Sequence, residues 1–168
     1  MAHSAAVQGA LISPVGHAQA VFFLRQLVGW WFFMLGRFKL FDAGTAAIVE
    51  EAFVKGYSGG WIPEFALRLG GYFDVYAEFL CGLMLILGFR VRLAVWLLMA
   101  LLVMVTFGHQ VKEATFAMGP RVFPPAMGLV GIALLYTPAR DVLSVDALTA
   151  RLHTRLFGAV AGGPKRPA

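Results

Sequence analysis

Two carboxylates lie within an otherwise apolar stretch of the chain. Asp74 and Glu78 belong to the segment Tyr72–Arg92, YFDVYAEFLCGLMLILGFRVR, which is long and apolar enough to enter a bilayer. Their spacing of four residues places both acids on one face of a helix, one turn apart. An acid inside a membrane helix is costly and usually faces a protein interior. We therefore expect a cation elsewhere in the chain to pair with these acids.

Polar residues near the ends of two other apolar runs could supply that partner. We expect the outer ends of the first three spans to meet, which predicts one polar intramembrane cluster: Arg37, Lys39, Asp74, Glu78, His109 and Gln110. One hypothesis is a structural ion-pair network that fixes helix register. The other is a polar pocket that binds a quinone headgroup or relays protons, for which an imidazole is suited near neutral pH. No catalytic residue is assigned.

The composition is typical of a membrane protein. Of the 168 residues, 60% are hydrophobic and only 14% are charged, whereas a soluble domain has roughly 25% charged residues. The single cysteine, Cys81, excludes an internal disulfide and a two-thiol redox cycle within the chain. We expect no metal site, no covalently bound cofactor and no nucleic-acid partner. The lipid bilayer is the first expected partner.

Hydrophobic runs and their breaks predict four membrane spans within a domain at residues 18–138. The spans are predicted at 19–41, 70–89, 93–108 and 122–137, after a flexible tail at 1–17. A short helix with Ile48 and Phe53 on one side is expected in the long first loop, with re-entry near Pro63. The predicted fold class is all-α: an integral membrane four-helix bundle with a short amphipathic C-terminal helix at 139–161, then a disordered tail at 162–168.

The loop charges indicate how the spans are oriented. Arg90 and Arg92 form a short basic turn without an acid, and we expect Arg25, with these two, to mark the cytoplasmic edge. We expect the long side chain of Arg25 to extend outward to the interface. This asymmetry predicts a multi-pass protein of the bacterial inner membrane with both termini in the cytoplasm.

Several short motifs recur in an order that resembles a known family. They are Arg25-x3-Gly29-x6-Gly36-x2-Lys39, Glu78-x3-Gly82, Leu85-x2-Gly88 before the basic turn, Pro138-Ala139-Arg140, and Leu143-Ser144-Val145-Asp146. Together, over about Val21 to Leu148, they resemble the DoxX family of small four-helix membrane proteins, which is related to the DoxD subunit of thiosulfate:quinone oxidoreductase. Arg25, Lys39 and Glu78 occupy recurrent charged positions of that family. The long first loop and the basic helical tail depart from its simplest pattern.

The resemblance implies a four-helix bundle tied to quinone-linked or oxidative-stress-linked redox chemistry, often with another subunit. We therefore expect a membrane subunit of a quinone-linked oxidoreductase that anchors a redox partner and shapes a polar pocket for a quinone. The alternative is a non-catalytic accessory subunit of a larger respiratory or photosynthetic membrane complex. In either case we expect other membrane or membrane-associated protein subunits as partners.

Overall fold

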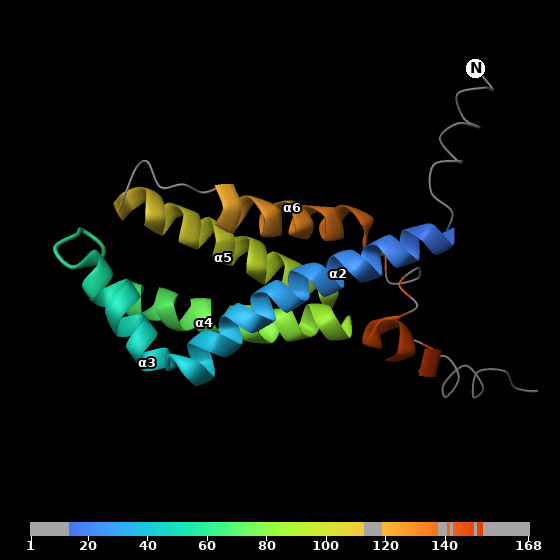
Figure 1. The fold of residues 1–168 in the computed structure, drawn as a ribbon, viewed down its shortest axis with the longest axis horizontal. Coiled ribbons are helices and arrows are strands. Elements are labelled where there is room, and N and C mark those ends of the chain that lie inside the picture. Colours follow the sequence, from blue (N-terminus) through green and yellow to red (C-terminus); the bar gives the residue numbers. More distant parts are fainter. Residues whose placement is uncertain (1–13, 113–118, 138–140, 142, 150, 153–168) are drawn as a thin grey trace, which may run out of the picture.

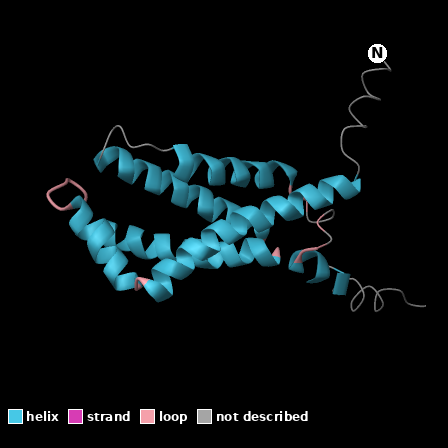
Figure 2. Ribbon diagram, viewed as in Figure 1, coloured by secondary structure: helices cyan, strands magenta, loops and turns pink. Residues whose placement is uncertain are grey.

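Four long helices form the fold. The computed structural model describes residues 14–112, 119–137, 141, 143–149 and 151–152, and these contain helices and turns without a strand (Figure 2). The long helices are α2 (Pro14–Arg37), α4 (Glu64–Leu87), α5 (Val91–Lys112) and α6 (Gly119–Leu135). They lie along a common direction, with α2 crossing α4 and α5 in the view of Figure 1. The predicted all-α membrane bundle is confirmed.

A helical connection links α2 to α4 at one end of the bundle. It consists of a π-helical turn η1 (Phe38–Asp42), α3 (Thr45–Ile48), a second π-helical turn η2 (Val49–Val54) and the 3-10 turn η3 (Lys55–Tyr57). Gly44, at φ 83°, supplies the left-handed backbone that separates η1 from α3. Pro63 is the N-cap of α4, where a missing N–H costs little. The short loop helix and the restart near Pro63 therefore agree with the sequence-based expectation.

The backbones of α2 and α4 approach closely because glycines line their contact. A Cβ atom added at Gly36 would collide with the backbone of Phe79, and one added at Gly82 would collide with the backbone of Phe33. Small residues at such contacts allow close approach in membranes, where packing replaces the hydrophobic driving force between helices. The α2–α4 contact is the most extensive in the fold. It therefore fixes which residues of the two helices face each other.

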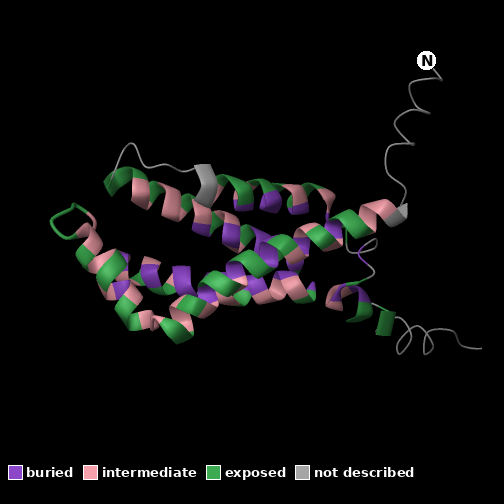
Figure 3. Cartoon of the chain, in the orientation of Figure 1, coloured by how far each residue is buried: buried purple, intermediate pink, exposed green. Residues whose placement is uncertain are grey.

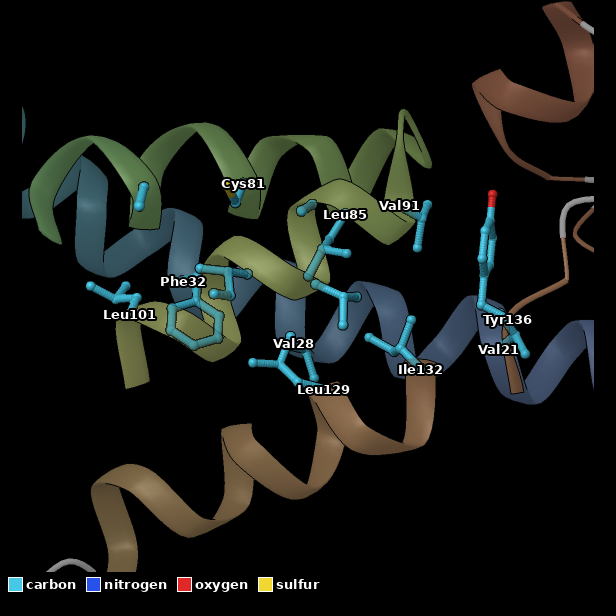
Figure 4. Packing of buried hydrophobic residues seen from close by; sticks show 14 residues of the cluster. Val21, Val28, Phe32, Cys81, Leu85, Val91, Leu101, Leu129, Ile132 and Tyr136 are labelled. Carbon is cyan, nitrogen blue, oxygen red and sulfur yellow. The ribbon is translucent and has the colours of Figure 1, made fainter. Parts of the chain in front are cut away.

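The core is apolar and lies between all four long helices. Its buried side chains come from every long helix and point toward one another, as Figure 4 shows: Val21, Val28, Phe32, Ala77, Cys81, Leu85, Val91, Ala94, Val95, Leu98, Leu101, Leu129, Ile132 and Tyr136. Large apolar side chains such as Leu27, Trp96 and Leu134 remain exposed. Exposed positions recur along the outer faces of the long helices, as Figure 3 shows. Such an outer face suits contact with lipid.

Three helical segments are long and apolar enough to cross a membrane by length and composition: Gly16–Asp42, Glu64–Leu87 and Val91–Lys112. The apolar part of α6, Val122–Leu135, is shorter. All 17 residues of α6 span roughly 25 Å at 1.5 Å per residue, slightly less than the hydrocarbon thickness of a typical bilayer.

Some helix bounds differ from the predicted spans. α4 begins at Glu64, next to the expected helix start at Pro63, and it continues as one helix through Gly70 and Gly71 into the predicted second span at 70–89. α2 begins at Pro14, within the predicted flexible tail, and His17 Nε2 lies 2.8 Å from the carbonyl oxygen of Leu135. In the predicted amphipathic segment 139–161, residues 145–149 and 151–152 are helical. The rest of that segment, except residues 141, 143 and 144, lies outside the described residues, as do residues 1–13 and the tail 162–168.

Candidate functional site

A lysine and two carboxylates form an ionic cluster between α2 and α4. Lys39 Nζ donates a hydrogen bond of 2.5 Å to Asp74 Oδ2 and lies 2.8 Å from Glu78 Oε2. Asp74 and Glu78 are 3% and 6% exposed. The predicted partner of the two acids is therefore Lys39.

Local helical geometry brings these three side chains together. Asp74 and Glu78 lie one turn apart on the face of α4 that is turned toward α2. Lys39 lies in η1, the π-helical turn that continues α2 directly. A π turn changes the direction of the side chains that follow it, and Gly36 brings this end of α2 against α4. The ammonium group can therefore reach both acids.

The cluster contains more negative than positive charge. One ammonium faces two carboxylates, so the ionised cluster has a surplus negative charge. Glu78 Oε2 is buried and lies 2.8 Å from Lys39 Nζ, so a single ammonium is shared between the two acids.

The cluster lines a cavity of about 470 Å³. Most of the wall is apolar or aromatic, and all three members of the ionic cluster contribute to it: Trp31, Phe32, Leu35, Lys39, Ile48, Ala52, Phe53, Tyr57, Ile62, Ala66, Leu67, Gly70, Asp74, Glu78, Leu101, Leu102, Met104, Val105, Phe107, Gly108, His109 and Val122. Ligand pockets are typically about 300–1,000 Å³, with a few polar groups among apolar side chains. The cavity fits that description.

The loop between α2 and α4 covers one side of the cavity. Gly71 of α4 leaves room for Phe53, since an added Cβ would lie 3.1 Å from the ring. Gly108 of α5 leaves room for the Tyr57 hydroxyl, which would lie 2.9 Å from a Cβ. Glycines on two helices thus allow the loop to pack closely over the cavity.

The remaining predicted cluster residues do not all join it. Arg37 pairs with Asp42 at 2.8 Å in a half-exposed salt bridge, so its predicted place in the cluster is wrong: the turn of η1 directs Lys39 to α4 instead. His109 lines the same cavity. Gln110 is exposed and is not part of the cavity wall, because it is one residue farther around α5.

A second ionic centre lies at the opposite end of the bundle. Arg25 is fully buried, and its Nε lies 3.2 Å from Asp141 Oδ2. Its Nη1 donates to the carbonyl of Leu85 at the end of α4, and its Nη2 donates to the carbonyl of Leu143. The expectation that Arg25 extends to the membrane interface is therefore wrong, since three internal acceptors surround it. Arg90 and Arg92 are exposed, as expected for edge charges.

The described part of the C-terminal segment is attached to this end. Asp146 accepts hydrogen bonds from the backbone N–H of Arg90 (3.0 Å) and from the Tyr136 hydroxyl (3.2 Å). Burial and the nearby Asp146 carboxylate raise the pKa of Tyr136 to about 12. Burial also raises the pKa of Asp141, although Arg25 opposes this. This part of the segment is therefore held by the bundle through specific polar contacts.

Sequence reasoning did not identify Asp141 or the aromatic loop residues of the cavity. Asp141 carried one usable signal, since it follows the last span on the side where Arg25 was expected. Phe53 and Tyr57 were part of a predicted amphipathic loop helix, but the side they face depends on how that loop folds back. Among the described residues, no group of three or more His, Cys, Asp or Glu side chains could hold a metal ion.

Comparison with known proteins identifies the family. Searches of curated proteins and of solved structures return no match. The DoxX family model matches residues 20–110, which include most of α2, the loop helices, α4 and most of α5. This region contains the complete Lys39 cluster and all but one of the residues that line the cavity. Because the match covers more than half of the 168 residues, the chain belongs to the DoxX family.

Proposed function

We propose that this chain is the membrane subunit of a quinone-linked oxidoreductase and binds the headgroup of a quinone-class carrier in its cavity. The observation that carries the proposal is the Lys39–Asp74–Glu78 cluster in the wall of an otherwise apolar cavity. A quinone-class carrier combines an aromatic-sized ring, oxygen atoms at its edge and an apolar tail. The cavity offers matching surfaces for the ring and for the oxygens.

The position of the cavity supports access from a membrane. Trp31 and Leu35 of α2 line it and are also partly exposed on the outer face of the bundle, at 44% and 40%. An apolar tail could follow this surface into the lipid while the ring remains inside. The polar groups of the cluster would then exchange protons with the bound oxygens.

A binding experiment with a cavity-filling variant tests the proposal. Ala66 lines the cavity from α4, whereas Ala100 is exposed on α5 and does not. We expect Ala66→Phe to abolish binding of a short-chain quinone to the protein in nanodiscs, measured by quenching of tryptophan fluorescence. Ala100→Phe should bind as the wild type does. Equal binding by both variants would show that the quinone occupies another place.

Partner subunits belong to the same proposal, because electrons from a bound carrier must pass to a redox protein. Gentle purification followed by lipid extraction addresses this point. A stoichiometric quinone in the extract, together with a co-purifying redox protein, is the expected result. A stable large complex without quinone would instead support an accessory subunit that only packs against other membrane proteins.

We further propose a place in the bacterial inner membrane, with the C-terminal end of the bundle in the cytoplasm. Exposed Arg90 and Arg92 at that end support this orientation. Ser58 is exposed in the loop at the other end, and the single native cysteine, Cys81, is buried. Ser58→Cys should therefore react with an impermeant maleimide in intact spheroplasts. Labelling only after lysis would reverse the orientation.

A further inference from the structure

The turn between α4 and α5 and the described part of the C-terminal segment form one surface at the end of the bundle. The backbone N–H of Asp146 donates to the carbonyl of Gly88 at 3.1 Å, and the Asp146 carboxylate accepts from the N–H of Arg90 at 3.0 Å. Arg90 has a left-handed backbone (φ 43°), which is uncommon for a residue with a side chain. The helical residues 145–149 therefore lie directly against the turn, beyond the end of α4 in Figure 1.

The charges at this end are sorted between the inside and the outside. Asp141 is buried against Arg25, and Asp146 binds the turn, so both acids are engaged internally. The exposed charges are three arginines, here called the basic edge: Arg90, Arg92 and Arg151. None of the three forms a salt bridge with a residue that the structure describes.

Three exposed cations at the opposite end of the bundle are, by contrast, paired with acids. The pairs are Arg37 with Asp42, Lys55 with Glu51, and Arg68 with both Glu50 and Glu64. An exposed cation beside a carboxylate offers little net charge to a partner outside the protein. The basic edge therefore concentrates positive charge that no acid of the described chain neutralises.

Apolar side chains share this surface with the basic edge. In the helical part of the C-terminal segment, Ala147 is buried, whereas Leu148 and Leu152, one turn apart, are 56% and 49% exposed. Leu87 and Leu93, before and after the turn, are also exposed. The apolar outer surface of α4 and α5 thus extends to the level of the arginines. Leucines beside arginines at the end of a membrane bundle suit the headgroup layer, which offers acyl chains and phosphates together.

We propose that this end of the bundle docks onto anionic lipid headgroups, with the basic edge on their phosphates and with Leu148 and Leu152 at the acyl boundary. The guanidinium group binds phosphate oxygens through paired hydrogen bonds. A basic residue near an anionic membrane surface raises the affinity about fivefold. This surface is separate from the cavity, so its test is independent of the proposed quinone site.

Lipid titrations of the full chain test the charge part of the proposal. We expect native mass spectrometry in detergent to give phosphatidylglycerol at least about fivefold tighter binding than phosphatidylcholine. The triple variant Arg90→Gln, Arg92→Gln, Arg151→Gln should reduce this preference to less than about twofold. The matched control Arg37→Gln, Lys55→Gln, Arg68→Gln removes the same charge from the opposite end and should retain the preference. In wild-type nanodiscs, salt at about 1 M should weaken the preference, because it screens exposed charges.

A fluorescent label tests the apolar part. Cys81 is buried, so Leu152→Cys gives one reactive site for an environment-sensitive dye in nanodiscs that contain phosphatidylglycerol. We expect blue-shifted emission that doxyl-labelled lipid quenches, whereas a dye at Ser58→Cys, in the exposed loop, should emit as in water.

The opposite results would overturn the proposal. Equal affinity for the two lipids, or equal losses in the two triple variants, would show that the basic edge does not select anionic lipid. A preference that is insensitive to salt would show the same without any substitution. Water-like emission at position 152 would show that the leucines face solvent and are left for a protein partner.

Discussion

Removal of the Asp141 charge should destabilise the bundle, because Arg25 would then be left buried without its carboxylate. Arg25 and Asp141 are 0% and 2% exposed and approach to 3.2 Å. Asp141→Asn keeps the size of the side chain and one acceptor oxygen, and the two hydrogen bonds of Arg25 to backbone carbonyls can persist. The substitution therefore tests the charge more than the shape.

The magnitude follows from the geometry of the pair. At 3.2 Å and an effective dielectric constant of about 20, the attraction between unit charges is about 5 kcal/mol. Part of this is offset, because the amide is less costly to bury than the carboxylate. Breaking a buried pair by removing one partner typically costs about 3–5 kcal/mol. We expect a loss of about 3 kcal/mol, since the amide oxygen still accepts a hydrogen bond.

The chain contains a matched control for this measurement. Arg37 and Asp42 form the same type of pair at 2.8 Å, but their side chains are 42% and 43% exposed. Asp42→Asn should change the free energy of unfolding by less than about 1 kcal/mol, because water screens exposed pairs. The assay is reversible unfolding of each variant in mixed detergent micelles. Equal losses for Asp141→Asn and Asp42→Asn would refute the buried charge pair.

Three further outcomes follow from other contacts. Lys39→Met should cost about 3 kcal/mol in the same unfolding assay, because two buried carboxylates lose their cation. Lys55→Met should leave the unfolding midpoint unchanged, since the salt bridge between Lys55 and Glu51 is exposed. Similar effects of the two substitutions would contradict the buried cluster. Gly82→Ala should cost about 1–3 kcal/mol of stability by forcing α2 away from α4. Gly70→Ala should cost nothing, because the added Cβ would lie 3.4 Å from the flexible Met104 side chain. If Gly82→Ala is equally harmless, the close approach of α2 and α4 is wrong. Because the folded pKa of Tyr136 is raised from 10.0 to about 12, its contribution to stability is present below pH 10 and is lost as the pH rises through about 12. Between pH 10 and pH 12, Tyr136→Phe should therefore lose less stability than the wild type. Parallel profiles of stability against pH for the two proteins would argue against the raised pKa of Tyr136.

The helical fold and the pairing of Asp74 and Glu78 with a cation could be predicted from the sequence, because both depend on local helical geometry and on the cost of burying charge. Apolar runs of span length predict helices, since a backbone in lipid must satisfy its own hydrogen bonds. The spacing of Asp74 and Glu78 determined their common face, and the cost of burying two acids required a cation near them. These inferences needed only helical geometry and solvation.

The choice of partners depended on the tertiary structure. Arg37 and Lys39 are two residues apart and were equally plausible in sequence, but the π turn η1 directs Lys39 to the acids and leaves Arg37 to Asp42. Arg25 was expected at the interface and is instead enclosed by the end of α4 and the segment after α6.

The cavity also depended on tertiary structure. Its wall combines residues of α2, the loop helices, α4 and α5, and its shape depends on how closely the loop packs against Gly71 and Gly108. The sequence by itself determined the helices, their apolar faces and the need to neutralise buried acids. Only the packing of distant segments decided which charges meet and where space remains, because these depend on helix rotation and loop direction, which local patterns do not fix.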